Sequence, residues 1–410
     1  MGKKRVGIIG AGPAGLMAAG RAAGLGHTVI VFEKNKRACR KLMITGKGRC
    51  NITNACPEDE LIKNIPGNGR FLYSSLSRFS NHDIMAFFSD LGVRLKTERG
   101  NRVFPESDKS SDICDALIDF AVKNRAVIRY NSRVSEILTE EGRVKGLVLD
   151  SGESFELDAV VVATGGLSYP ATGSTGDGYR MAQVLGHTVT ELRPSLVPLE
   201  TVETWVSEVS GLTLKNIVLT VYDPSGKKVF EELGEMLFTH FGVSGPLVLS
   251  ASRHILDSGF AGSVLVIDMK PALTEEVLYR RIQRDFEKFS RKQLSNALHE
   301  LLPKSFIPVF IQLLEIPPEK PVNQITRQER QRMVSLLKGI RLTVSRSRPI
   351  AEAIVTTGGI KIGEIDPKTM ESKLVNGLYF AGEIIDVDAY TGGFNLTIAL
   401  STGYAAGSSV

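Results

Sequence analysis

Short apolar runs and longer apolar or amphipathic stretches alternate over the first 190 residues. Residues 5–10 and 28–33 have the length and composition of buried strands, and residues 13–24 between them are expected to form a helix. In residues 158–163 every residue after Asp158 is apolar, which is typical of a strand covered on both faces. By the same rules we expect helices at 80–91 and 111–124, and strands at 126–130 and 134–138. The alternation predicts an α/β domain with a parallel sheet.

The pattern changes near residue 193. Residues 193–273 are rich in β-branched residues with Pro and Gly between the runs, as expected for antiparallel strands. Residues 274–337 are charged and amphipathic, as expected for helices. The first pattern returns after residue 342, with a predicted strand at 376–383 and a glycine-rich turn that leads into an apolar helix. We therefore predict one domain formed by residues 1–192 and 343–410, interrupted by a mixed β plus helical insert at 193–342.

The first predicted strand ends in a glycine motif. Gly10, Gly12 and Gly15 have the spacing Gly-x-Gly-x-x-Gly between a strand and a helix. Gly10 permits a sharp turn, Gly12 lets the backbone approach a pyrophosphate, and Gly15 permits close helix packing. Glu33 ends the next strand, where a carboxylate accepts hydrogen bonds from ribose hydroxyls. A glycine-rich turn without a ligand is the alternative, but strand, glycines, helix and acid in this order indicate a dinucleotide site.

Composition and charge limit the class of protein. With 410 residues, 42% hydrophobic and 23% charged, the chain has the composition of a soluble globular protein with two or three domains. No apolar run is long enough to span a membrane, and no apolar signal region follows the first residues, so we expect a cytoplasmic protein. The four cysteines lack paired Cys-x-x-Cys spacing, which argues against a metal site and a redox disulfide.

The carboxyl-terminal segment favours FAD over NAD as the resident cofactor. Both present an ADP half to the first glycine motif, so that motif does not separate them. FAD also carries a ribityl chain and an isoalloxazine ring, which need a second set of backbone groups. A strand that delivers Gly382 and Glu383, followed by a helix that begins near Gly393, supplies such groups, with the positive helix end near the flavin. The alternative is a packing helix whose glycines permit close approach.

The chain resembles the bacterial BaiN-like, aminoacetone-oxidase-like family of NAD(FAD)-utilising dehydrogenases, which are two-dinucleotide-binding-fold flavoproteins. The most specific matching segment is Gly48-Arg-Cys-Asn-Ile-Thr-Asn54. The other matching segments are Gly10 to Gly15, Lys41 to Lys47, Ala163 to Gly166 with Tyr169-Pro170, Gly176 to Gly178, Phe238 to His240 with Ser244 to Pro246, and Gly382-Glu383 with Thr391 to Leu396. The resemblance implies a Rossmann-like FAD-binding domain and suggests NAD(P)H as a transient reductant, although no second glycine motif follows a strand in the insert.

The residues expected to bind the cofactor come from several separate segments. Thr45 to Asn51 offers flexible backbone, a guanidinium and amide donors, and the resemblance places this segment at the cofactor. Thr164 to Gly166 and Gly176 to Gly178 follow a buried strand, where ligands of open α/β sheets gather. The expected set is Gly10, Gly12, Pro13, Ala14, Gly15, Glu33, Lys34, Lys41, Gly46, Gly48, Arg49, Cys50, Asn51, Val134, Thr164, Gly165, Gly166, Tyr169, Asp177, Gly382, Glu383, Gly393, Phe394, Asn395 and Leu396.

Cys50 and His240 are the candidate catalytic residues. A thiol at Cys50 beside the flavin would act as a proton donor, whereas the alternative is a small buried hydrophobe. His240 is the best-placed imidazole for general acid catalysis if the insert covers the flavin. The alternative is a structural histidine.

Three functions remain open. The leading one is an FAD-dependent oxidoreductase that passes hydride from NAD(P)H to an activated C=C or C=O of a small molecule; similar proteins have been linked to bile-acid enone reduction and amine oxidation. The first alternative is a flavin-dependent ribosomal RNA dihydrouridine synthase, with RNA phosphates held by basic residues of 327–348. The same residues also fit a solvated face. The second alternative, a flavin-binding redox sensor, lacks a sensor cysteine pair.

Overall fold

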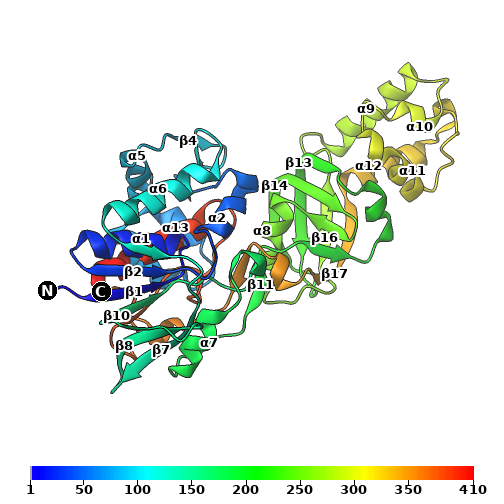
Figure 1. Ribbon diagram of the computed structural model, residues 1–410. Helices are drawn as coiled ribbons and strands as arrows, with labels where there is room; N and C mark the ends of the chain where they lie inside the picture. The colour runs from blue at the N-terminus through cyan, green and yellow to red at the C-terminus, as the bar shows by residue number, and fades with distance from the viewer. Residues whose placement is uncertain (1) are drawn as a thin grey trace. The chain divides into compact units, whose positions relative to one another are not determined.

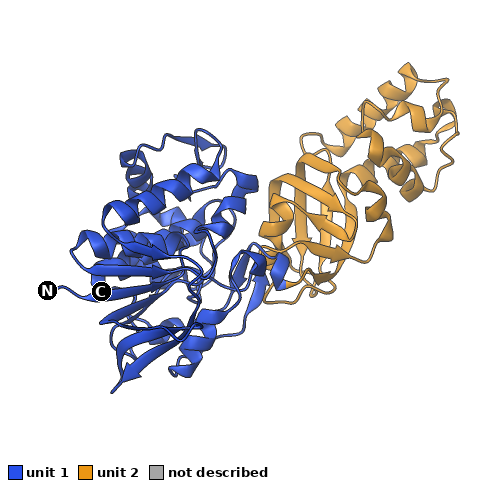
Figure 2. Cartoon of the chain, in the orientation of Figure 1, with its two compact units in different colours: residues 1–195, 350–410 blue, residues 196–349 orange. Residues whose placement is uncertain are grey.

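The computed structural model describes residues 2–410, which fold into two compact units. Unit 1 consists of Met1–Ser195 and Ile350–Val410, and unit 2 consists of Leu196–Pro349 (Figure 2). The unit boundaries differ by several residues from the predicted boundaries at 192/193 and 342/343. Strand β11 (Arg193–Ser195) pairs with β18 (Val355–Thr357) inside unit 1, and β17 (Ile340–Ser347) extends through the second predicted boundary as a strand of unit 2.

Unit 1 contains a five-stranded parallel sheet of the predicted α/β type, with the strand order β19-β10-β1-β2-β6. The strands are β1 (Arg5–Ile9), β2 (Thr28–Phe32), β6 (Val127–Arg129), β10 (Ala159–Val162) and β19 (Leu378–Phe380). The four residues of β10 are all buried, as their uninterrupted apolar sequence predicts. The Rossmann-like fold expected from the sequence is confirmed.

Three helices pack together over one face of this sheet (Figure 1). They are α1 (Pro13–Gly24), α6 (Ser110–Lys123) and α13 (Phe394–Ser409). Glycines bring α1 and α13 close, since a Cβ added at Gly403 or Gly407 would lie 2.4 Å from the backbone oxygen of Ala14 or Ala18, respectively. The two helices therefore run in the same direction, with the second half of α13 packed against α1 and the first residues of α13 extending past the start of α1.

Smaller elements complete unit 1. An antiparallel sheet is formed by β7 (Val134–Glu140), β8 (Arg143–Leu149) and β9 (Ser154–Glu156), with a turn at Gly142 between β7 and β8. A second small sheet contains β3 (Thr53–Asn54), β4 (Leu95–Glu98) and β5 (Arg102–Pro105). The remaining α-helices are α2 (Arg40–Ile44), α3 (Glu58–Lys63), α4 (Tyr73–Arg78), α5 (Asn81–Asp90) and α7 (Asp177–Val184).

Unit 2 is a closed six-stranded barrel with a helical part and its own hydrophobic core. The barrel order is β12 (Leu199–Thr201), β15 (Gly242–Ser244), β14 (Lys228–Thr239), β13 (Thr213–Tyr222), β16 (Val264–Asp268) and β17. The helices are α8 (Pro246–His254), α9 (Glu275–Lys288), α10 (Leu294–Ala297), α11 (Ile307–Leu314) and α12 (Arg327–Lys338). Within residues 2–410, no helix has the length and apolar character needed to cross a membrane.

Candidate dinucleotide site

The three glycines of the first motif have different physical roles. Gly10 has a φ of 102°, and a Cβ there would lie 2.6 Å from the backbone oxygen of Ala163. A Cβ at Gly15 would lie 2.0 Å from the backbone oxygen of Gly10. The fold therefore requires both glycines. Gly12 has an ordinary φ of −82°, and a Cβ there would have no described protein atom within 4 Å. Packing does not explain a glycine at position 12, whereas a closely bound ligand does.

Gly12 is also the N-cap residue of α1. Among the described residues, no side chain caps this end of the helix, and Pro13 occupies its first turn. The first amides of a helix lack partners within the helix, and the helix dipole makes this end positive. The open space at Gly12 and the uncapped amides together fit a pyrophosphate group.

Glu33 lies directly after β2 and is buried. Its Oε2 accepts a hydrogen bond from the backbone N–H of Ala11 at 2.9 Å. Its Oε1 accepts hydrogen bonds from the backbone N–H and the side-chain amide of Asn35, at 2.8 and 2.7 Å. A carboxylate has about four acceptor positions. The protein uses three of them, which leaves less capacity for the two ribose hydroxyls than the sequence predicted.

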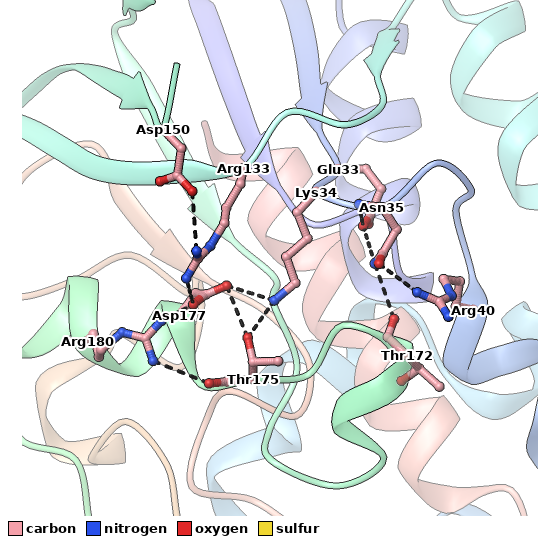
Figure 3. Close-up of polar contacts among 10 residues, drawn as sticks. All are labelled: Glu33, Lys34, Asn35, Arg40, Arg133, Asp150, Thr172, Thr175, Asp177 and Arg180. Atoms are coloured by element: carbon pink, nitrogen blue, oxygen red, sulfur yellow. Dashed lines mark hydrogen bonds and ion pairs between the residues drawn. The ribbon is translucent and has the colours of Figure 1, made fainter. Parts of the chain in front are cut away.

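Asp177 is the anion at the centre of a charged cluster beside Glu33 (Figure 3). Its carboxylate pairs with Lys34 Nζ at 2.7 Å, with Arg133 at 2.9 Å and with Arg180. Burial alone would raise the pKa of Asp177, but hydrogen bonds from Arg133 and Lys34 outweigh burial and hold this pKa well below its usual range. The structure therefore brings together the predicted ligands Lys34 and Asp177, but in an ion pair with each other.

A second polar cluster joins Lys41 to Glu383. Lys41 Nζ lies 2.6 Å from Glu383 Oε2 and 2.6 Å from Ser168 Oγ. Glu383 Oε1 also accepts hydrogen bonds from Ser168 Oγ at 2.9 Å and from the backbone N–H of Thr356 at 2.8 Å. Sequence reasoning missed Ser168 and Thr356, although the run Thr-Thr-Gly-Gly at 356–359 is the kind of polar, glycine-rich segment that marks a site.

The segment from Thr45 to Asn51 is a turn with left-handed backbone, which glycine adopts freely but which is uncommon for Lys47 and Cys50. Gly46, Gly48 and Cys50 have φ values of 56°, 83° and 58°. The Arg49 guanidinium pairs with Glu98 and Asp108 and lies over the ring of Phe104. This predicted cofactor ligand is therefore already engaged by other side chains of the protein.

Cys50 has no exposed surface, and its burial raises the pKa of the thiol to about 12, although a hydrogen bond to Thr45 opposes this shift. The thiol is therefore protonated at neutral pH. Like Cys50, the other cysteines (Cys39, Cys56 and Cys114) are buried and free.

Buried polar atoms without partners mark where a ligand fits. Within the described part of the chain, Asn51 Oδ1, Thr164 Oγ1 and Thr357 Oγ1 are buried and lack a hydrogen-bond partner. Leaving such an atom unpaired costs about 1–3 kcal/mol. Asn51 and Thr164 belong to the predicted cofactor set, and their unsatisfied oxygens support it.

The last helix offers a second uncapped amino terminus. Its N-cap residue, Gly393, has a φ of 101°, and a Cβ there would lie 2.4 Å from Thr53 O. No side chain in residues 2–410 caps this end. The Asn395 amide instead donates to Ala389 O at 2.8 Å and accepts from Ala389 N at 3.0 Å, so this predicted ligand holds the preceding loop.

The remaining predicted ligands lie in the same unit, in less distinctive settings. Gly382 follows β19, and a Cβ added there would lie 2.9 Å from Ala14 Cβ. Tyr169 has a φ of 52°, and its backbone N–H donates to Ala351 O. Val134 is the first residue of β7. Gly165 and Gly166 follow β10, and Phe394 and Leu396 lie in the first turn of α13.

His240 is not part of this unit. It lies in an exposed turn of unit 2 after β14, with its ring edge-on to Phe241 at 5.0 Å. The basic run 327–348 also belongs to unit 2 and is largely paired. Arg346 and Arg348 bind Glu200, and Lys338 binds Asp268. No group of His, Cys, Asp and Glu side chains in residues 2–410 is arranged to hold a metal ion.

Comparison with known proteins gives matches along nearly the whole chain. The family pattern of the HI0933-like protein Rossmann domain matches residues 4–409. A 3-dehydro-bile acid delta(4,6)-reductase of Clostridium scindens is 30% identical and is aligned over 98% of both chains. A ribosomal RNA dihydrouridine synthase of Haemophilus influenzae is 31% identical over 98% of this chain and 97% of that protein.

Solved structures share the fold at low sequence identity. A 3-ketosteroid delta1-dehydrogenase of Sterolibacterium denitrificans superposes with a TM-score of 0.54 at 14% identity, over 99% of each chain. The E. coli quinol fumarate reductase FrdA gives a TM-score of 0.52 at 18% identity, over 99% of this chain and 69% of that one. At these identities the likeness concerns the fold alone.

Proposed function

The chain belongs to the HI0933-like family of Rossmann-domain proteins, and from this premise we propose that it is an FAD-dependent oxidoreductase. The observation that carries the proposal is the pair of uncapped helix ends, at Gly12 and at Gly393, on one domain. One such end fits a pyrophosphate, and a second fits a ligand with a further electron-rich group. FAD has both features.

The residues divide between the two halves of this cofactor. Gly10 to Gly15 and Glu33 would hold the ADP half, while Asn51, Thr164 and the first turn of α13 would hold the ribityl and flavin half. Bound there, FAD supplies two-electron hydride chemistry. The protein contributes orientation, unpaired acceptors and exclusion of water. The direct test is the absorption spectrum of the purified protein, in which a colourless preparation that does not take up added FAD would refute the proposal.

We further propose that the electrons pass from NAD(P)H to an activated C=C or C=O of a small molecule. The Clostridium scindens relative, named as a bile acid reductase, supports this choice. His240 is kept as a candidate general acid. A panel of enones and purified ribosomal RNA, each offered with NADH or NADPH, separates this activity from the RNA alternative.

The RNA alternative is favoured by the Haemophilus influenzae relative, named as a ribosomal RNA dihydrouridine synthase. The basic run gives it less support than the sequence suggested. Arg332 pairs with Glu315, and Arg330 donates to Ile325 O, so these cations stabilise unit 2. A redox sensor is disfavoured because the cysteines are buried.

Reversal of the exposed basic residues tests the RNA alternative. Arg327 and Arg341 are exposed, and no ion pair or hydrogen bond of either side chain is present among the described residues. We expect Arg327→Glu with Arg341→Glu to leave FAD content and enone reduction unchanged. If this face holds RNA, the slope of log affinity against log salt should become shallower by roughly 0.7–0.9 for each lost phosphate contact. Unchanged RNA affinity and slope would exclude this face as the RNA site.

Substitution of Glu33 tests the ADP half of the site. We choose Glu33→Gln over the charge-reversing Glu33→Arg, because the glutamine oxygen can still accept both bonds from Asn35 and only the bond from the Ala11 N–H is lost, whereas an arginine loses all three. With glutamine we expect FAD affinity to fall about tenfold, since a hydrogen bond to a charged group contributes about 1.5–3 kcal/mol. Equilibrium dialysis measures the change, and undiminished affinity would remove Glu33 from the site.

Cys50 and Asn51 are expected to differ in their effects. Cys50→Ser keeps a small buried side chain, so we expect FAD retention with full turnover, which would restrict Cys50 to packing. Asn51→Ala removes the unpaired Oδ1 and should lower FAD affinity. Turnover lost in Cys50→Ser with its FAD intact would instead assign a proton-donor role to the thiol, which is protonated because its pKa is raised to about 12.

A further inference from the structure

A pocket lies at the amino ends of the parallel strands of unit 1, opposite the carboxyl ends where the dinucleotide site lies. It has a volume of about 800 Å³. Its walls include Arg5, the first residue of β1, together with Asp158 just before β10 and Gly377 just before β19. These residues precede or begin parallel strands, whereas Gly10 follows β1. The pocket is therefore separated from the dinucleotide site by the length of the strands. Ligands of open α/β sheets ordinarily bind at the carboxyl ends of the strands, so the fold family does not account for a pocket at the amino ends.

The acidic groups of this pocket are satisfied by the protein. Arg5 pairs with Glu156 at 3.2 Å, and the backbone N–H of Arg5 donates to Asp158 at 2.6 Å. Glu371 accepts a hydrogen bond from the backbone N–H of Gly377 at 2.8 Å. These contacts leave the carboxylates of the pocket partly or fully engaged.

Three cations of the same pocket are left over. They are Lys3, Lys4 and Arg143. Among residues 2–410, none of their charged groups has a hydrogen bond or an ion pair, whereas the other two cations of the lining, Arg5 and Lys145, pair with Glu156 and Glu140. Two carboxylates of the lining, Asp158 and Glu371, accept hydrogen bonds only from neutral backbone N–H groups and keep their charge, so the three cations leave the pocket with a small positive excess. The floor is rigid, because Tyr379 is almost fully buried and its hydroxyl donates to Ser409 O at 3.0 Å.

From this arrangement we propose that the pocket binds a phosphate-bearing anion of nucleotide size through Lys3, Lys4 and Arg143. Its volume falls in the range of about 300–1,000 Å³ that is typical of small-molecule sites. A guanidinium matches two phosphate oxygens at once, and ammonium groups add point charges. The phosphate comes from a free nucleotide or from a nucleic-acid backbone. The site is independent of the proposed oxidoreductase activity.

Calorimetry with the FAD-saturated protein at low salt tests the proposal. The probes are inorganic pyrophosphate, ADP and a short oligouridylate. Wild-type protein should bind pyrophosphate, and Lys4→Glu with Arg143→Glu should weaken this binding by at least about tenfold, because attraction becomes repulsion. Arg70→Glu with Arg78→Glu, a matched reversal of two exposed cations elsewhere in unit 1, should not. Tighter binding of ADP identifies a free nucleotide, and tighter binding of the oligouridylate identifies a nucleic-acid backbone.

Two further variants keep the outcome unambiguous. If charge reversal prevents folding, the neutral pair Lys3→Ala with Arg143→Ala should still fold and lose affinity. Gly12→Asp, which changes only the dinucleotide site and is measured without FAD because we expect it not to retain FAD, should bind pyrophosphate as the wild type does. Failure of the oxidoreductase proposal therefore leaves this test intact. The absence of wild-type binding to all three probes, or undiminished binding in both pocket variants, would overturn the proposal.

Discussion

Gly12→Asp is expected to produce a folded protein that does not retain FAD. The residue has an ordinary φ of −82°, and a Cβ there would meet no described protein atom within 4 Å. The substitution therefore costs the free protein neither strain nor a clash. The new carboxylate would stand where we place the pyrophosphate, and repulsion between anions should lower FAD affinity by about 100-fold or more, which is roughly 3 kcal/mol. Flavin absorbance after gel filtration and the melting temperature without FAD measure the two effects.

Two other glycines serve as controls. Gly363 also has open space around a missing Cβ but lies away from the motif, in the short helical turn Ile362–Glu364, so Gly363→Asp should change neither stability nor FAD content. Gly15→Ala should destabilise the fold itself, because its Cβ would lie 2.0 Å from the backbone oxygen of Gly10. A Gly12→Asp protein that keeps its flavin would show that no pyrophosphate lies against this turn.

Asp177→Asn is expected to lower the free energy of unfolding by about 2 kcal/mol. Asparagine keeps the shape but removes the carboxylate that Lys34, Arg133 and Arg180 share. Removing one partner of a buried ion pair costs about 3–5 kcal/mol, and we reduce this figure because the Arg133 side chain is 50% exposed. Urea unfolding at neutral pH measures the change.

The pH dependence of the same variant tests the cause. Because the pKa of Asp177 is lowered in the folded protein, its contribution is complete above the unfolded-state pKa of about 3.9 and is lost as the pH falls below that value. The difference in stability between wild type and variant should therefore shrink as the pH falls below about 4 and vanish only below the lowered pKa of the folded state. The control is Asp150→Asn, whose carboxylate is 49% exposed and lies 3.3 Å from Arg133; it should cost at most about 1 kcal/mol. Equal effects of the two variants would contradict a special role for Asp177.

The sequence alone determined the parts of the fold that depend on local pattern. The apolar run 5–10 and the glycines after it predicted β1 and the start of α1 at Pro13, because strand length, turn geometry and helix entry are set by adjacent residues. The strand and the glycine-rich turn at 376–393, which lead the chain back into the first domain, were predicted from the sequence for the same reason. The predicted second boundary of the insert, at 342/343, lies within β17, which continues to Ser347 and pairs with β12 and β16, strands that are distant in sequence.

The tertiary structure decided which charged side chains are free to meet a ligand. Lys34, Asp177, Arg49 and Lys41 all have the chemistry of cofactor ligands, but each binds a side chain that is distant in sequence. No spacing rule predicts such pairs, because they depend on how separate loops meet at one edge of the sheet. The sequence therefore determined where a dinucleotide site can form, since backbone turns are local. Only the fold decided which polar groups are left unpaired there, since the pairing of side chains depends on contacts across the whole unit.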